Sequence, residues 1–487
     1  MTYAAATIQW TDSLTRTLRL AATAALLITG AVGVRGDDAD IVDVCRRYLT
    51  VEGDAQSELA AVIARFEGAV NPVIEALSLP VGPARQDETG LLTNQAFTDP
   101  QLKQPHAEDL LHLFVPPDYT PSQPFGLLIF MHGGGGKTSR DHPQHVVSHP
   151  DDDRDSYGLQ PHFTDSEFII AAPSAPWNEK TGARWNVPSA DDYIHDVIQE
   201  CCYRFNINAD RVFLGGYSMG GFGAYHLCQR LNDRLAGGVV FSGAWKTTHW
   251  KAWTGLPVFI RHGQTDAVAP GSDGLRSRPR FTDVFYARAA HQRLAELSID
   301  HVYAEDDGGH AIRDAADAMS QLPRWMKQHT RDPFASHVVA VSRRGWKSST
   351  DTPTAHSRWV TISEIGAEGM TFDAVDVQGP SPSFKETREA FEAQTLQLGT
   401  RNVEAGLVDA RITGNNHIVV QTENVRRFSL WLHPSMVDFS KPLHISVNGK
   451  QSGHKITESL LDALRSYRRR HDWKLIYHTE INLSVNQ

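Results

Sequence analysis

The chain has few cysteines, and their spacing does not organise a fold. Only four occur among 487 residues, namely Cys45, Cys201, Cys202 and Cys228. A disulfide-stabilised scaffold needs a higher density, and no spacing among them suggests a zinc site. Cys201 and Cys202 are adjacent on a predicted helix and cannot easily bridge each other, whereas a bond from Cys45 to another cysteine is possible in an oxidising compartment. We mainly expect buried free thiols.

Positive charge is also in deficit. Lysine and arginine number 47 against 57 aspartate and glutamate residues, so the formal net charge is -10, and the acidic residues are spread along the chain. Binding to a phosphate backbone requires a basic surface, which argues against a nucleic-acid partner. No internal repeat is present either, which excludes a propeller or a solenoid. The sequence does not set an oligomeric state.

Long apolar runs are missing, apart from one near the start. Arg16 and Arg19 precede a run from Leu20 to Val34 that is rich in alanine and leucine. The run is short for a transmembrane helix and has the length of the apolar region of a signal peptide. We expect residues 1–36 to be removed, the mature chain to be exported to the periplasm or secreted, and no membrane span to remain. An uncleaved N-terminal anchor is the alternative.

Three regions follow this segment. Apolar residues at helical spacing predict a helical extension over residues 37–108, kinked at Pro72. Residues 109–332 alternate apolar strands with helices, which predicts an α/β domain with a mostly parallel sheet and helices on both faces. Residues 333–487 predict a β-rich accessory domain. The length and composition are typical of a globular protein of two or three domains.

The expected elements are as follows. In the α/β region we expect strands near residues 110–115, 126–131, 168–172, 212–214, 238–241, 258–261 and 301–304, and a helix over 192–205. In the β-rich region we expect strands near residues 359–362, 412, 417–420, 428–432 and 444–447, a tight turn at Asn448-Gly449, and helices over 385–396 and 457–470.

One motif stands at the end of the strand over 212–214. Gly216-Tyr217-Ser218-Met219-Gly220 fits G-x-S-x-G, and a helical stretch follows it. A strand that turns sharply into a helix brings backbones too close for a Cβ on either side of the turning residue. The turn therefore holds Ser218 in a strained, exposed position, as a nucleophile requires.

A serine nucleophile needs an imidazole base, and the imidazole needs a carboxylate that fixes its tautomer. Asp266 follows the predicted strand 258–261, at a strand end where catalytic loops gather. His310 follows the last predicted strand of the α/β region, in a loop that Gly308 and Gly309 make adaptable. We expect Ser218, Asp266 and His310 to be the catalytic residues.

The negative oxygen of an acyl-transfer intermediate needs two backbone donors. We expect one from Met219, directly after the nucleophile. The other should come from the glycine run after His132, with Gly134 favoured over Gly133.

Trp185, Trp245 and Tyr217 are expected to line the substrate pocket. The segment 141–155 is rich in His and Asp but offers abundant rather than converging ligands, so we expect no metal.

These residues together resemble the α/β-hydrolase superfamily over residues 109–330. Residues 191–213 and the Gly-Tyr-Ser-Met-Gly-Gly elbow look like secreted esterases of the polyhydroxybutyrate-depolymerase and feruloyl-esterase group, and prolyl-oligopeptidase-like enzymes share much of the pattern. The resemblance implies a serine esterase that uses no cofactor and cleaves small-molecule or polymer-linked carboxylic esters through an acyl-enzyme. A serine peptidase and a non-catalytic binding protein are the alternatives. Because the catalytic set is complete at His310, the site should need nothing from beyond residue 333.

Overall fold

The structure is a computed structural model of the 487-residue chain. It describes residues 36–79, 85–134, 147, 158–178, 182–187, 189–266, 282–344, 356–379, 393–414 and 416–485. The expected signal peptide lies outside the described residues, except for its last residue. The chain divides after Leu77 into two compact units. Among the helices of the described ranges, none has the length and apolar character needed to cross a membrane.

The described residues of the first unit form three helices rather than one kinked helix. They are α2 (Gly36–Thr50), α3 (Gly53–Ile63) and α4 (Val70–Ser78). Pro72 does not kink a helix but stands in the first turn of α4, where its missing N–H removes no helical hydrogen bond. The buried residues of α4 recur at helical spacing, as expected; they are Val70, Val73, Ile74 and Leu77.

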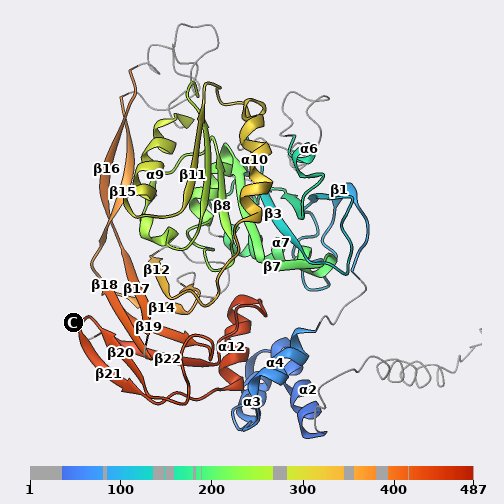
Figure 1. Ribbon diagram of the computed structural model, residues 1–487, viewed down its shortest axis with the longest axis vertical. Coiled ribbons are helices and arrows are strands. Elements are labelled where there is room, and N and C mark those ends of the chain that lie inside the picture. Colours follow the sequence, from blue (N-terminus) through green and yellow to red (C-terminus); the bar gives the residue numbers. More distant parts are fainter. Residues whose placement is uncertain are drawn as a thin grey trace, which may run out of the picture. The chain divides into compact units, whose positions relative to one another are not determined.

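An eight-stranded sheet forms the centre of the second unit (Figure 1). The strand order is β1-β2-β4-β3-β7-β8-β10-β11; the pairs β1–β2 and β2–β4 are antiparallel and all others are parallel. This confirms the predicted mostly parallel sheet. Its strands are β1 (Gly90–Gln95), β2 (Leu111–Val115), β3 (Phe125–Met131), β4 (Phe168–Pro173), β7 (Ile207–Tyr217), β8 (Gly237–Phe241), β10 (Val258–Gly263) and β11 (His301–Asp306).

Strand β1 was not predicted, because it lies in the segment expected to be helical. It is an edge strand with no fully buried residue. An exposed edge strand lacks the continuous apolar run that reveals the central strands.

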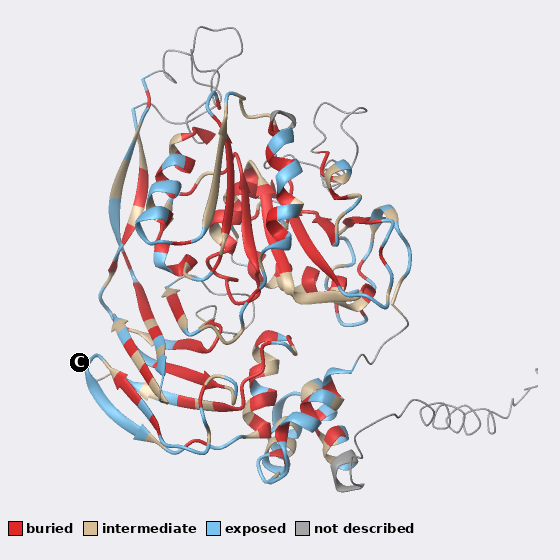
Figure 2. Ribbon diagram, in the orientation of Figure 1, coloured by how far each residue is buried: buried red, intermediate tan, exposed pale blue. Residues whose placement is uncertain are grey.

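Helices cover both faces of this sheet, as predicted. On β3, Leu127, Ile129 and Met131 belong to one apolar core, whereas Leu128 and Phe130 belong to the other, because successive strand residues face opposite sides. The first core contains residues of α7 (Ala190–Arg204), α8 (Met219–Leu227) and α9 (Phe285–Glu296); the second contains residues of α6 (Gln160–Phe163) and α10 (Ala316–Lys327). Figure 2 shows the central strands almost wholly buried.

The C-terminal part is β-rich, as predicted. One sheet contains β12 (His337–Arg343), β17 (Ala405–Gly414), β18 (His417–Glu423), β20 (Leu443–Val447) and β21 (Lys450–His454). The other contains β13 (His356–Ser357), β14 (Val360–Ile365), β19 (Val425–Leu432) and β22 (Thr479–Ser484), and α12 (Leu460–Arg470) accompanies them. Asn448 and Gly449 have φ values of 49° and 85° and form the predicted turn between β20 and β21.

One predicted helix of this part is wrong at its end. The expectation covered residues 385–396, of which 385–392 lie outside the described residues. Thr395 and Leu396 begin strand β16 (Thr395–Val403). The pairing of β16 with β15 (Met370–Gln378) decides its conformation, and this long-range contact is not visible as a local pattern.

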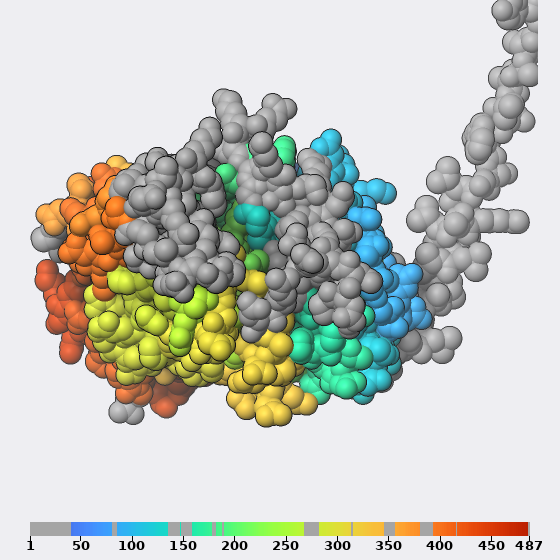
Figure 3. All heavy atoms as spheres, turned by 90° about the horizontal axis from the view of Figure 1, so that it is seen from above, coloured from blue at the N-terminus to red at the C-terminus, as the bar shows by residue number. Residues whose placement is uncertain are grey.

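Strands β15 and β16, here called the β15–β16 arm, reach the α/β part. Thr247 and Thr248 form the short strand β9 and pair with Ala374 and Asp373 of β15. Arg293 of α9 forms an ion pair of 2.8 Å with Asp373. Figures 1 and 3 both show the arm, in orange, beside α9. The C-terminal part is therefore built into the α/β part rather than appended to it.

Buried charges join the two parts a second time. The guanidinium of Arg331 contacts Asp472 of the C-terminal part and Asp210 of β7, each at 2.6 Å, and Arg234 contacts Asp472 at 2.5 Å. Burial raises the pKa of Asp472, but Arg331 and Arg234 outweigh it and lower this pKa to about 2. Removing one member of such a cluster leaves a buried charge without compensation.

Candidate active site

Strand β7 ends at Tyr217 and α8 begins at Met219, so Ser218 alone makes the turn between them. Its backbone has φ 54° and ψ -115°, a strained conformation for a residue with a side chain. A Cβ on Gly216 would lie 2.4 Å from the Gly220 backbone, and one on Gly220 would lie 2.0 Å from the Met131 carbonyl oxygen. The backbone therefore passes too close to Gly216 and Gly220 for a side chain at either position, as the motif predicted.

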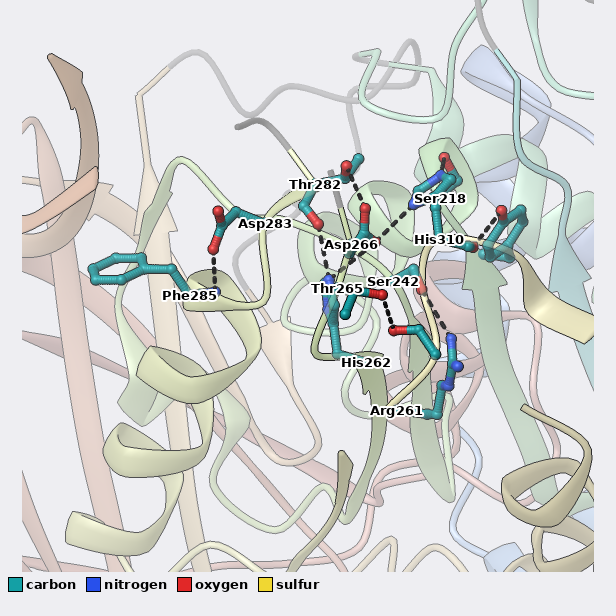
Figure 4. Close-up of polar contacts among 12 residues, drawn as sticks. Ser218, Ser242, Arg261, His262, Thr265, Asp266, Thr282, Asp283, Phe285 and His310 are labelled. Atoms are coloured by element: carbon teal, nitrogen blue, oxygen red, sulfur yellow. Dashed lines mark hydrogen bonds and ion pairs between the residues drawn. The ribbon is translucent and has the colours of Figure 1, made fainter. Parts of the chain in front are cut away.

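Ser218, His310 and Asp266 form a hydrogen-bonded chain (Figure 4). His310 Nε2 lies 2.9 Å from Ser218 Oγ, and His310 Nδ1 lies 2.7 Å from Asp266 Oδ2. The carboxylate can only accept, so Nδ1 carries the proton and Nε2 is free to accept from the serine hydroxyl. The structure therefore brings together the three side chains that the sequence singled out, in the order that base catalysis requires.

Besides His310, two further side chains contact the carboxylate of Asp266. Thr282 Oγ1 donates to Asp266 Oδ1 at 2.8 Å, and His262 Nε2 lies 3.2 Å from Oδ2. Burial raises the pKa of Asp266, but hydrogen bonds from His262 and His310 outweigh it and hold this pKa far below its usual range. Asp266 is thereby kept ionised although it is 1% exposed.

His262 is a residue of the site that sequence reasoning missed. Its Nε2 lies 2.9 Å from the carbonyl oxygen of Thr282, an acceptor, which places the imidazole proton on Nε2. The same N–H therefore faces both Thr282 and Asp266. His262 follows the predicted strand 258–261 and stands four residues before Asp266, and this position could have indicated a role in the site. With 23 histidines in the chain, however, any single histidine is weak evidence.

The loops that carry Asp266 and His310 are tied together at the ends of β10 and β11. Gln264 N donates to Asp306 O at 2.8 Å, and Thr265 N donates to Gly308 O at 3.0 Å. Below them the fully buried guanidinium of Arg261 forms a two-point ion pair with the Asp306 carboxylate, at 2.5 and 2.6 Å. Such a two-point ion pair fixes geometry as well as charge, so the adjacent strands β10 and β11 position Asp266 and His310.

Tyr217, which was expected in the substrate pocket, contacts His310. Its hydroxyl donates to the backbone carbonyl of His310 at 2.7 Å, and the two rings lie 5.2 Å apart between centroids. The residue before Ser218 thus holds the His310 loop through its hydroxyl group.

Trp185, which was expected in the substrate pocket, supports the glycine loop after β3. It is 1% exposed, and its Nε1 donates to the His132 carbonyl at 3.1 Å. His132 Nε2 accepts from Ala175 N at 3.1 Å, so its Nδ1–H donates to the Gly133 carbonyl, 2.7 Å away. The start of the glycine loop is therefore anchored from two sides.

The expected oxyanion donors lie at the same edge of the sheet. Met219 is the first residue of α8, where backbone N–H groups point out of the helix end. Gly134 is exposed with φ 96°, whereas Gly133 is buried. A positive φ suits glycine and lets the backbone turn toward a ligand. Gly134 thus follows the anchored start of the glycine loop, and Met219 opens α8.

Trp245 lines a cavity, although it is 4% exposed. Its indole nitrogen donates to the carbonyl of Tyr286 at 3.0 Å.

The His- and Asp-rich segment 141–155 lies, except for Val147, outside the described residues. Among the residues that are described, no group of three or more His, Cys, Asp or Glu side chains could hold a metal ion.

The strand order, the strained turn before α8 and the loops after β10 and β11 define an α/β-hydrolase fold. Residues 177–300 match the profile of the phospholipase/carboxylesterase family, Abhydrolase_2. These residues include the strained turn and the loop of Asp266 but end before His310.

Curated and solved proteins are similar over part of the chain. The bifunctional acetylxylan esterase/xylanase XynS20E of Neocallimastix patriciarum is 26% identical over 160 residues, which make up 32% of this chain and 21% of the relative. The chain thus spans about a fifth of that relative's length. A thermostable esterase is 20% identical over 50% of this chain and 63% of its own, with a TM-score of 0.38. The acetyl xylan esterase of Aspergillus awamori is 14% identical over 49% of this chain and 99% of its own, with a TM-score of 0.34.

Proposed function

We propose that this protein is a serine hydrolase of carboxylic esters with Ser218, His310 and Asp266 as its catalytic triad. One observation carries the proposal. A serine with φ 54° at a strand-to-helix turn lies within hydrogen-bond distance of an imidazole that is itself bonded to a buried carboxylate. A structural serine needs neither the backbone strain nor a base oriented toward it.

In the proposed mechanism, Ser218 Oγ attacks the ester carbonyl carbon while His310 Nε2 takes the hydroxyl proton. Asp266 keeps the imidazole in the required tautomer and stabilises the imidazolium. The N–H groups of Met219 and Gly134 bind the negative oxygen of the tetrahedral intermediate. His310 then gives its proton to the leaving alcohol, and an acyl-enzyme remains. Water, deprotonated by His310, releases the acid and restores Ser218.

Two features of the comparisons favour an ester over a peptide. The family profile that matches residues 177–300 is described as phospholipase/carboxylesterase, and the curated relative has acetylxylan esterase in its name. We therefore propose an ester of a small or polymer-linked alcohol as the substrate. No metal or other cofactor is part of the proposed mechanism, because the three side chains supply the nucleophile, the base and its orientation.

Replacing Ser218 by alanine tests the nucleophile. We expect Ser218→Ala to abolish turnover of p-nitrophenyl acetate and labelling by a fluorophosphonate, while Ser320→Ala on the exposed face of α10 leaves both unchanged. Feruloyl esters and peptide anilides measured beside it separate an esterase from a peptidase. Continued labelling of Ser218→Ala would show that another residue is the nucleophile.

We further propose that the chain acts after export, on the grounds of the apolar run 20–34. Expression in a bacterium with the N-terminal segment intact should place the activity outside the cytoplasm and yield a mature N-terminus near Asp37. Activity retained in the cytoplasm at full chain length would contradict this.

A further inference from the structure

One tryptophan of the α/β part is open to solvent. Trp177 is 44% exposed, and no other tryptophan, tyrosine or phenylalanine among the described residues is exposed to this extent. Within the described part of the chain, its indole ring takes part in no hydrogen bond or ring contact. Single exposed apolar residues are common on protein surfaces, so the position of Trp177 decides whether it has a task.

Trp177 belongs to a short hairpin that follows strand β4. It begins β5 (Trp177–Asn178) and pairs with Ala183 of β6 (Gly182–Ala183). The N–H of Arg184 donates to the carbonyl of Pro176 at 3.2 Å and continues this pairing. Paired strands hold the backbone extended and fix the direction of each side chain. The indole is therefore carried by a fixed backbone.

Both ends of this hairpin are bonded to His132, the residue that opens the glycine loop. Ala175 N donates to His132 Nε2, and Trp185 Nε1 donates to the His132 carbonyl, each at 3.1 Å. The same carbonyl oxygen lies 3.0 Å from the position that a Cβ on Gly220 would take, so it packs against the turn of Ser218. Direct contacts thus connect the hairpin to the glycine loop and to the nucleophile turn.

The sheet sets the distance between Trp177 and Ser218. Strands β4 and β7 flank β3 and both run parallel to it, so the residues that follow them lie at the same edge. Neighbouring strands are about 4.8 Å apart, which puts β4 about 10 Å from β7. Trp177 stands two residues beyond Ala175, about 7 Å of extended chain. It is therefore placed to meet a remote part of a substrate rather than the ester bond at Ser218.

The exposure of the indole favours a ligand that stays in water on one side. An alkyl chain on such an open surface would keep much of its area in water and lose most of the hydrophobic gain. A pyranose ring can place its C–H face on the indole while its hydroxyl groups remain hydrated. The face of an aromatic ring carries partial negative charge, which attracts the polarised C–H groups of a sugar.

We propose that Trp177 is a specificity-determining residue whose indole stacks on a pyranose ring of a polymer-linked ester, away from the ester bond that Ser218 attacks. The proposal rests on the ester-hydrolase function proposed above and assigns a residue to the recognition of its alcohol part. A remote contact of this kind contributes only where the substrate is long enough to reach it. Small esters should therefore be indifferent to Trp177.

Turnover of small and extended esters tests the proposal. Acetylated β-1,4-linked tetrasaccharides of xylose, glucose and mannose are compared with p-nitrophenyl acetate. On the tetrasaccharide that is cleaved best, we expect Trp177→Ala to lower kcat/KM about tenfold, mainly through KM, the size of one lost aromatic contact. On p-nitrophenyl acetate the change should stay below twofold. Trp177→Phe keeps an aromatic face and should retain most of the activity on the tetrasaccharide.

Leu297→Ala is the matched control. Leu297 is 40% exposed, similar to Trp177, but it follows α9 and precedes β11, which places it at the opposite, amino edge of the sheet. We expect this variant to cleave all substrates like the wild type. If circular dichroism and gel filtration show that Trp177→Ala does not fold, Trp177→Leu replaces it, since leucine keeps apolar volume without the ring.

Calorimetric titration separates the sugar contact from the chemistry. Ser218→Ala is titrated with the same acetylated tetrasaccharide, so that no turnover occurs. We expect saturable binding, and binding about tenfold weaker when Trp177→Ala is added to Ser218→Ala.

Equal losses of kcat/KM on the tetrasaccharide and on p-nitrophenyl acetate would overturn the proposal, because the hairpin would then act only by supporting the glycine loop. A loss confined to p-nitrophenyl octanoate would also overturn it, since the indole would then bind an acyl chain. So would a wild type that cleaves p-nitrophenyl acetate but neither cleaves nor binds any of the tetrasaccharides. Failure of the wild type to cleave any ester would overturn the proposed function instead, and the calorimetric result would still report on Trp177.

Discussion

The hydroxyl of Tyr217 donates a hydrogen bond to the backbone carbonyl of His310, 2.7 Å away. One residue of the G-x-S-x-G turn is the proposed nucleophile, Ser218, and its neighbour Tyr217 holds the loop of the proposed base, His310. The distance between Ser218 Oγ and His310 Nε2 is thus set from within the turn itself, across strands β7 and β11, which are not adjacent in the sheet.

Removing this hydroxyl should slow catalysis without unfolding the protein. We expect Tyr217→Phe to lower kcat about tenfold, because a lost hydrogen bond of about 1.4 kcal/mol would loosen His310 in the transition state. KM should change less than twofold. Tyr303→Phe is the control, because the Tyr303 hydroxyl bonds Glu305 rather than His310. A change confined to KM would indicate that Tyr217 contacts substrate instead.

The anchoring of the glycine loop can be tested at Trp185. Trp185→Phe keeps most of the buried ring but removes the donor to the His132 carbonyl. We expect kcat to fall about fivefold to tenfold, since a mobile loop places the Gly134 N–H less accurately. Steady-state kinetics with p-nitrophenyl acetate measures it. An unchanged kcat with a raised KM would instead support the expectation that Trp185 lines the substrate pocket.

His262 is expected to act as a positioning residue for Asp266. His262→Gln keeps a donor side chain of nearly the right length, whereas His262→Ala leaves Asp266 and the Thr282 carbonyl without it. We expect kcat/KM to fall more than tenfold in the alanine variant and to recover partly in the glutamine variant. Equal losses in both, together with an equally lowered Tm, would indicate a purely structural role.

Acid should weaken the junction at Asp472. Its pKa is lowered to about 2 in the folded protein, so its contribution to stability is complete above about pH 4 and is lost as the pH falls toward 2. We expect Asp472→Asn to reduce the free energy of unfolding at pH 7 by about 3–5 kcal/mol and to flatten its decline between pH 4 and 2. Urea unfolding at each pH measures both.

Asp438→Asn is the control for this experiment. Asp438 also has a pKa lowered to about 2, chiefly through hydrogen bonds from Lys441 and Ser440, but it is a surface residue. An exposed ion pair contributes little and is screened by salt. Equal effects of the two variants would contradict a special role for the buried junction.

The central sheet and the elbow are readable from the sequence because local signals carry them. Continuous apolar runs indicate β3, β4 and β7. The spacing of Gly216, Ser218 and Gly220 indicates a turn in which the backbone leaves no room for a Cβ on either side of the serine. Strand-end positions likewise single out Asp266 and His310. In each case a short stretch of chain contains the physical reason.

The remainder depends on contacts between distant residues. Trp185 and Tyr217 were expected to face substrate because both stand near the motifs, but nothing local reveals that their polar atoms are engaged by His132 and His310. His262 was overlooked for the same reason. The expectation that the site needs nothing from beyond residue 333 rested on the triad alone, and the pairing of β15 with β9 is a long-range contact that the local pattern does not reveal.

The pairing of β9 with β15 has a practical consequence for anyone who wishes to re-engineer this chain. Cutting near Arg331 would separate that guanidinium from Asp472 and strip β15 from Thr247 and Thr248. The C-terminal part therefore cannot be exchanged as an interchangeable cassette, in the way that a tethered carbohydrate-binding unit can. Chimeras with related enzymes should place their crossover points so that β9, α9 and the arm are inherited from the same parent.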